Sequence, residues 1–139
     1  MIAAAAAAIA LLPFAYAPRS VSADESVLAA VPFSDTALAE ARAANKPVFV
    51  WFTADWCLTC KVNEGVAIER EATRAAFEKG GVVAMRGDWT RRDPAITRFL
   101  TAHGAAGVPL YLWYAPGQGA EILPQVLTPD TLTELASRS

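Results

Sequence analysis

The two cysteines of the chain, Cys57 and Cys60, are separated by two residues and form a Cys-X-X-Cys motif. The β-forming run 48–53 (VFVWFT) precedes the motif, and a stretch of helical composition follows it. A helix N-terminus presents unpaired backbone N–H groups and the positive end of the helix dipole, so we expect Cys57 to be stabilised as a thiolate. Cys60, one turn further along, should be more buried. The spacing predicts a pair that changes between dithiol and disulfide.

Two other uses of this pair stay open at this point. A permanent structural disulfide would gain little from so short a loop, because the entropy of loop closure grows with loop length. Two thiolates could also bind a soft metal ion such as Cu(I), although no third ligand lies within reach in the sequence. With one His and two Cys, the chain cannot form a four-ligand zinc site of the usual Cys/His kinds.

Three residues beside the motif are further candidates. Glu64 follows Cys60 by four positions and Cys57 by seven, so a helix places the three on one face. A carboxylate there could accept and return the proton of Cys60, and a solvent-exposed helix glutamate is the equal alternative. Asp55 and Trp56 directly precede Cys57, and we expect them to flank its sulfur and to contact a substrate.

A proline motif lies about fifty residues further on. Gly107, Val108 and Pro109 precede the apolar run 110–114. An X-Pro bond at the head of a strand is a position at which a cis peptide would expose the backbone of Val108 beside the sulfurs. His103 ends the apolar stripe of a helix, and we expect it to pack there rather than to act as a base.

The elements that position these residues alternate along the chain. Asp35 is the predicted cap of the first helix, Gly65 interrupts the second, Asp93 caps the third, and Pro124 places the last strand at a sheet edge. This order predicts an α/β fold with a mixed central sheet flanked by helices. The expected strands are 27–33, 48–53, 82–89, 110–114 and 121–127, and the expected helices are 36–44, 57–79, 94–103 and one from 129 onward.

The composition limits the class of protein. A chain of 139 residues with 54% hydrophobic and 19% charged residues is long enough for one domain and too apolar to be disordered. A net charge of −2 and the absence of a basic cluster argue against a nucleic-acid partner. Arg91 and Arg92 are a short pair flanked by acids, and we expect them at the surface.

Residues 2–17 carry no charge and have three interpretations. They form a secretory signal, with cleavage near residue 17 or 23, or the end of a truncated membrane span, or a helix that covers a core. The first two place the rest of the chain outside the cytoplasm. We therefore predict a signal-like or truncated transmembrane segment at 1–23 and one domain at 24–139.

Three segments carry a family resemblance: 52–64 (FTADWCLTCKVNE), 88–94 (DWTRRDP) and 107–114 (GVPLYLWY). Together they resemble the thioredoxin superfamily over 27–137, and within it the C-terminal periplasmic domain of the DsbD/ScsB thiol:disulfide interchange proteins. The resemblance implies a thioredoxin-like fold and a monomeric protein-disulfide reductase without an organic cofactor or metal. It implies electron relay from a DsbD-type membrane domain to periplasmic thiol proteins, in the periplasm or at the outer face of the inner membrane.

The resemblance also assigns roles to individual residues. Cys57 becomes the nucleophile, Cys60 the resolving thiol and Pro109 the cis-proline, and Glu64 matches an acidic residue near the active site of the DsbD domain. Trp51 stands where thioredoxin and DsbD have a buried acid on the strand, so proton transfer would rest on Glu64, water or the partner. Two alternative functions remain: a stand-alone periplasmic reductase, for instance one serving cytochrome c maturation, and a Cu(I)-binding module.

Overall fold

The computed structural model describes residues 26–139, so the interpretations of 1–23 concern residues outside this range. Its centre is a five-stranded sheet with the strand order β1-β3-β2-β4-β5. β1, β3 and β2 run parallel, whereas β4 and β5 are antiparallel to their neighbours, which confirms the predicted mixed sheet. The strands are β1 (Val31–Pro32), β2 (Val48–Thr53), β3 (Val83–Asp88), β4 (Leu110–Tyr114) and β5 (Ala120–Ile122).

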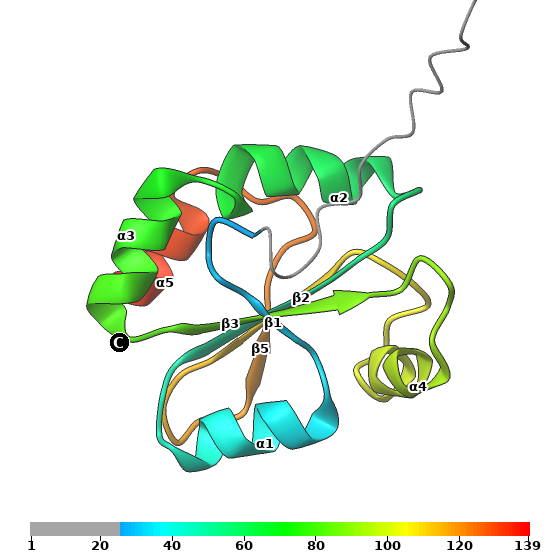
Figure 1. Cartoon of the computed structure of the whole chain (residues 1–139), viewed down its shortest axis with the longest axis horizontal. Helices are drawn as coiled ribbons and strands as arrows, with labels where there is room; N and C mark the ends of the chain where they lie inside the picture. Colours follow the sequence, from blue (N-terminus) through cyan, green and yellow to red (C-terminus); the bar gives the residue numbers. More distant parts are fainter. Residues whose placement is uncertain (1–25) are drawn as a thin grey trace, which may run out of the picture.

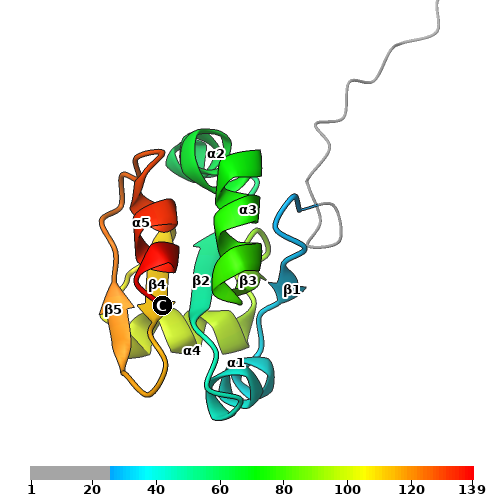
Figure 2. The same cartoon turned by 90° about the vertical axis from the view of Figure 1, so that its left-hand side faces the viewer.

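Helices cover both faces of the sheet (Figure 1). On one face lie α1 (Asp35–Ala43) and α4 (Pro94–Ala102); on the other lie α2 (Leu58–Asn63), the π-helical turn η2 (Glu64–Ile68), α3 (Glu71–Gly80) and α5 (Thr131–Ser137). Figure 2 shows α3 and α5 side by side between the edge strands β1 and β5. None of these helices, which all belong to residues 26–139, is long and apolar enough to cross a membrane.

The central strand β2 is buried at all six positions. Phe49 and Trp51 belong to the core beneath α3 and α5, whereas Val50 and Phe52 belong to the core above α1 and α4. A strand that is covered on both faces needs apolar side chains at successive positions, which explains the continuous run in the sequence. Because β2 is held on both faces and both edges, its C-terminal end is a fixed point from which the cysteine motif starts.

Both outer strands are shorter than the sequence predicts. The predicted strand 27–33 is wrong over its first half, because Ala29 has a positive φ of 51° and its N–H donates to the Ser26 carbonyl in a turn. The predicted strand 121–127 ends at Ile122. β5 is an edge strand as expected, but Pro124 lies beyond its end, since proline has no N–H with which to continue the ladder.

The helix after the cysteines also differs from the prediction of one helix over 57–79 with a break near Gly65. Gly65 lies inside η2, and the break falls later, at Glu69, whose N–H bonds to the Glu64 carbonyl at 2.7 Å. The Glu69 carboxylate binds the Ser26 hydroxyl at 2.8 Å and the Val27 N–H at 2.7 Å. These bonds to a segment 42 and 43 residues away fix the break, and no local pattern encodes them.

The predicted helix ends are partly correct. The N-cap of α1 is Ser34 rather than Asp35: the Ser34 hydroxyl accepts from Ala37 N–H, and Asp35 occupies the first turn. Asp93 caps α4 as predicted, accepting from two backbone N–H groups. His103 ends α4, with Nδ1 2.8 Å from the Phe99 carbonyl oxygen, in the packed position that the sequence predicts.

Candidate active site

Cys57 and Cys60 form a disulfide at the N-terminus of α2, directly after β2 and one short turn. Their Cα atoms are 5.3 Å apart. Cys57 is the N-cap of α2, and its sulfur accepts from the Cys60 N–H at 3.2 Å. Cys57 is 7% exposed and Cys60 is fully buried. The sulfur nearer the surface is thus the one at the helix tip, where free N–H groups and the helix dipole favour a thiolate after reduction.

The loop before β4 lies beside the sulfurs. The Val108–Pro109 peptide bond is cis, as the sequence predicts. Val108 packs against the small cluster that Ala54, Cys57 and Cys60 form. The two segments of the motif, separated by about fifty residues in sequence, therefore meet at one place on the surface.

Trp56 is held in an exposed position next to Cys57. Its side chain is 53% exposed, and its Nε1 donates to the Thr90 carbonyl at 3.1 Å. The Arg92 guanidinium lies 5.6 Å from the Trp56 ring centre and 5.2 Å from that of Trp89, within the range of cation–π attraction. Arg91 and Arg92 lie at the surface as predicted, but the stacking of Arg92 was not foreseen.

Thr90 connects this loop to the turn before the cysteines. Its hydroxyl accepts from the Asp55 N–H at 3.0 Å and donates to the Asp88 carboxylate. Partial burial of the Asp88 carboxyl would raise its pKa, but hydrogen bonds from the Thr90 hydroxyl and N–H outweigh burial, aided by the charges of Arg86 and Lys61. The pKa of Asp88 is therefore held below its ordinary value.

Glu64 belongs to an ion-pair group at the end of α2. The Lys61 ammonium is 3.1 Å from Glu64 Oε2 and 3.9 Å from Asp55 Oδ1. The Glu64 side chain is 13% exposed, so the alternative of a solvent-exposed glutamate is wrong. Its second oxygen, Oε1, is buried without a hydrogen-bond partner among residues 26–139. The backbone becomes π-helical from Glu64 onward, but the Glu64 N–H still bonds to the Cys60 carbonyl, so the predicted α-helical spacing holds from Cys57 to Glu64.

Asn63 is a site neighbour that the sequence reasoning missed. It is 2% exposed, and its amide nitrogen donates to the Tyr111 hydroxyl at 2.9 Å and to the Gln125 carbonyl at 2.6 Å. Burial raises the pKa of Tyr111 to about 12, with the Asn63 hydrogen bond lowering it and the Glu64 charge raising it. The signal in the sequence was a polar residue three positions after a buried cysteine, on the same helix face.

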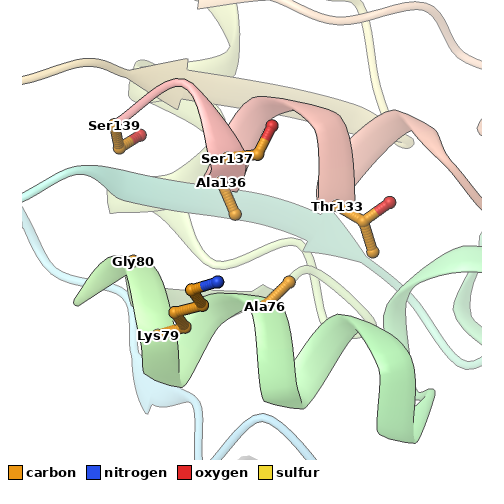
Figure 3. Close-up of a pocket in the computed structure, with 7 residues that line it drawn as sticks. All are labelled: Ala76, Lys79, Gly80, Thr133, Ala136, Ser137 and Ser139. Atoms are coloured by element: carbon orange, nitrogen blue, oxygen red, sulfur yellow. The ribbon is translucent and has the colours of Figure 1, made fainter.

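The structure has one hollow beside the cysteine motif and another away from it, between α3 and α5. A polar hollow of about 450 Å³ borders the motif and is lined by Asp55, Asp88, Thr90, Arg91 and Asp93. A second one, of about 350 Å³, lies between α3 and α5 and is lined by small and polar side chains such as Thr133 and Ser137 (Figure 3). No candidate site residue lines the second hollow. Within residues 26–139, no three His, Cys, Asp or Glu side chains group as metal ligands.

Comparison with known proteins gives one family. A family model described as thioredoxin-like matches residues 29–116. The chain is 39% identical over 83 residues to the thiol:disulfide interchange protein DsbD 1 of Pseudomonas aeruginosa, and 34% identical over 84 residues to the DsbD of Vibrio cholerae. Each match covers 60% of this chain but 14% of the relative, so the chain spans a small part of these proteins.

Solved structures agree on the fold. The oxidised C-terminal domain of Neisseria meningitidis DsbD superimposes with a TM-score of 0.59 at 24% identity, covering 78% of this chain and 98% of that one. A thioredoxin mutant from Halobacterium salinarum gives a TM-score of 0.57 at 22% identity, covering 81% and 92%. Both comparisons confirm the predicted sheet with helices on its two faces.

Proposed function

Because the chain belongs to the thioredoxin-like family, we propose that it is a thiol:disulfide oxidoreductase that exchanges the Cys57–Cys60 disulfide with other proteins. One observation carries the proposal: this disulfide lies at the start of a helix that follows the central strand, and Val108, whose peptide bond to Pro109 is cis, packs against the cysteine cluster. A structural disulfide would need neither the helix tip nor the adjoining proline loop. The same arrangement makes one sulfur accessible and keeps the other behind it.

The exchange starts from the reduced pair. The Cys57 thiolate attacks one sulfur of a partner disulfide, so the partner's S–S bond breaks and a mixed disulfide with Cys57 forms. The displaced partner sulfur takes up a proton. Cys60 then loses its proton and attacks the Cys57 sulfur, which closes the Cys57–Cys60 bond and releases the second partner thiolate. Two electrons and one proton pass from the pair to the partner, which is left with one thiol and one thiolate, and no other redox group is needed.

The burial of the two cysteines supports this order of roles. Cys57 retains 7% exposure and caps α2, whereas Cys60 is fully buried. The sulfur of a partner protein therefore reaches Cys57 first, and the buried Cys60 attacks the mixed disulfide from the side of the protein interior. We assign the removal of the Cys60 proton to Glu64, since its carboxylate is mostly buried, has one oxygen without a hydrogen-bond partner in the described part of the chain, and lies at the end of the same helix. Trp51, on the strand beneath, has no group that titrates in this range.

The surroundings of Cys57 suit a polypeptide substrate. Trp56 offers a large exposed ring that Thr90 and Arg92 hold in place. Val108, from the loop before β4, packs against the cluster that Ala54, Cys57 and Cys60 form. We assign substrate contacts to Asp55, Trp56 and Val108, and the positioning of the approaching chain to Pro109.

We further propose that the donor of electrons is a DsbD-type membrane domain and that the acceptors are periplasmic thiol proteins. The support is similarity to proteins named thiol:disulfide interchange protein DsbD. The domain would act as a monomer in the periplasm or at the outer face of the inner membrane. Because both electrons are carried by the cysteine pair, the relay needs no bound cofactor.

Two variants and a reconstitution test these assignments. The Cys60→Ser variant should stop at the mixed disulfide and accumulate a covalent adduct with insulin on Cys57, which non-reducing electrophoresis detects. The Cys57→Ser variant is the matched control and should form no such adduct. An absence of adduct in both variants would count against the exchange reaction. Reduction of the oxidised chain by a reconstituted DsbD-type membrane domain supports the relay, whereas insulin reduction without it supports the stand-alone reductase.

A further inference from the structure

The nitrogen and the oxygen of the Asn63 side chain are both hydrogen-bonded, and the residue is almost fully buried. Its amide nitrogen donates to the Tyr111 hydroxyl at 2.9 Å and to the Gln125 carbonyl at 2.6 Å, and its oxygen accepts from the Leu127 N–H at 3.1 Å. At 2% exposure, solvent cannot replace any of these partners. The amide therefore fixes the position of the chain at 125–127 relative to α2.

The same segment is bound to the proline loop. The Gln125 side-chain nitrogen donates to the Pro109 carbonyl at 3.4 Å. The ladder between β4 and β5 ends nearby: its last residue pair is Leu112 with Ile122, and the Leu123 N–H still bonds to the Tyr111 carbonyl at 2.9 Å. Segment 123–127 is thus held by the bonds to Asn63 and Pro109 together with the buried side chains of Leu123 and Leu127 at its two ends.

These hydrogen bonds connect α2, which carries Cys60, with Pro109 in the loop before β4. Asn63 is three residues after Cys60 on α2, and it reaches Pro109 through Gln125. Val126, between two residues bonded to Asn63, is 73% exposed. A polypeptide that passes Pro109 on its way to Cys57 would also meet this segment.

We infer that Asn63 is a positioning residue that fixes segment 123–127 and Pro109 relative to the cysteines. This arrangement is needed to bind a protein disulfide productively, whereas a small disulfide does not depend on it. The inference rests on the proposed function and deepens it, because it concerns the class of disulfide that the site accepts. A small disulfide needs access to the Cys57 sulfur alone. A protein disulfide must also place its backbone along Pro109 and its flanking residues against Gln125 and Val126.

The test compares two substrates with the same reduced protein. Insulin serves as the protein disulfide and dithiodipyridine as the small one. We expect Asn63→Ala to lower kcat/KM for insulin about tenfold, mainly through a higher KM, because misplaced substrate contacts lose rate steeply. The rate with dithiodipyridine should stay unchanged. Gln125→Ala removes the part-buried bond to the Pro109 carbonyl, leaves the buried Asn63 amide in place and should give a smaller loss of the same kind.

Controls separate the possible failures. Gln118→Ala makes the same change in the β4–β5 hairpin, at the opposite end of β4 from Pro109, and should alter neither rate. Equal losses with both substrates, or unchanged insulin kinetics in both Asn63→Ala and Gln125→Ala, would overturn the positioning role while leaving the exchange reaction intact. If the unaltered protein reduces neither substrate, the proposed function itself fails, and the inference fails with it.

Discussion

The hydroxyl of Thr90 offers a sharp test of how the loop after β3 is held against the cysteine turn. The hydroxyl accepts from the Asp55 N–H at 3.0 Å and donates to the Asp88 carboxylate. Thr90→Val keeps the shape of the side chain but removes both bonds. The bond between the Trp56 ring and the Thr90 carbonyl involves the backbone and remains possible.

The expected loss of stability follows from these two bonds. A neutral hydrogen bond contributes about 1 kcal/mol and one to a charged group about 2 kcal/mol. The Asp88 side chain is 46% exposed, so water replaces much of the charged bond. We expect the free energy of unfolding to fall by about 1 kcal/mol. With a urea dependence of about 1 kcal/mol per molar, the midpoint of unfolding should fall by about 1 M.

The loss should depend on pH in a defined direction. The pKa of Asp88 lies below its ordinary value in the folded chain. A carboxyl with a lowered folded pKa adds stability above its unfolded pKa of about 3.9, and this stability is lost as the pH falls through the folded value. The difference in the free energy of unfolding between the wild type and Thr90→Val should thus be largest near neutral pH and smaller in acid.

Urea unfolding of the oxidised protein at neutral and acid pH measures both effects. Thr101→Val is a matched control, because the Thr101 hydroxyl donates to an uncharged group, the Thr97 carbonyl within α4. Its effect should be within about 0.5 kcal/mol and independent of pH. Equal midpoints for Thr90→Val and wild type, or a gap that does not narrow in acid, would refute this account of the loop.

Three further changes test neighbouring residues. Glu64→Gln cannot accept a proton, so the pH profile of disulfide exchange should shift, and an unaltered profile would remove Glu64 from proton transfer. Trp56→Ala should lower kcat/KM for insulin about tenfold and leave the dithiodipyridine rate unchanged, and an equal fall in both would show an effect on Cys57 itself. Tyr111→Phe removes a phenol whose pKa is raised to about 12. The wild type should therefore lose free energy of unfolding as the pH rises from about 10 to about 12, and the variant should not. Urea unfolding across this pH range measures the difference.

The parts of the fold that could be predicted are those encoded locally. The apolar run of β2, the capping residue Asp93 and the buried stripe of α4 follow from periodicity and capping chemistry, and they were found. The π-helical turn was missed because its end depends on Glu69 binding Ser26 and Val27, far away in sequence. The short β1 has the same origin, since those bonds hold its expected first half in a turn.

The candidate site divides in the same way. The cysteine motif and the cis bond before Pro109 are visible as short patterns, and the structure brings them together. The roles of Asn63 and Thr90 were not visible, because each depends on partners from other elements: Gln125 in one case and Asp55 in the other. Polar side chains inside a site are bound by long-range contacts that composition and spacing do not specify.

The central claim is that the Cys57–Cys60 bond opens and closes in exchange with other thiols, and its reduction potential tests this most directly. The protein is equilibrated with glutathione or dithiothreitol mixtures, quenched with an alkylating agent and weighed by mass spectrometry. The account predicts that both thiols appear together, in one two-electron step, at a potential between about −300 and −120 mV, where disulfide-exchange proteins lie. A potential below about −300 mV, the range of structural disulfides, would contradict it.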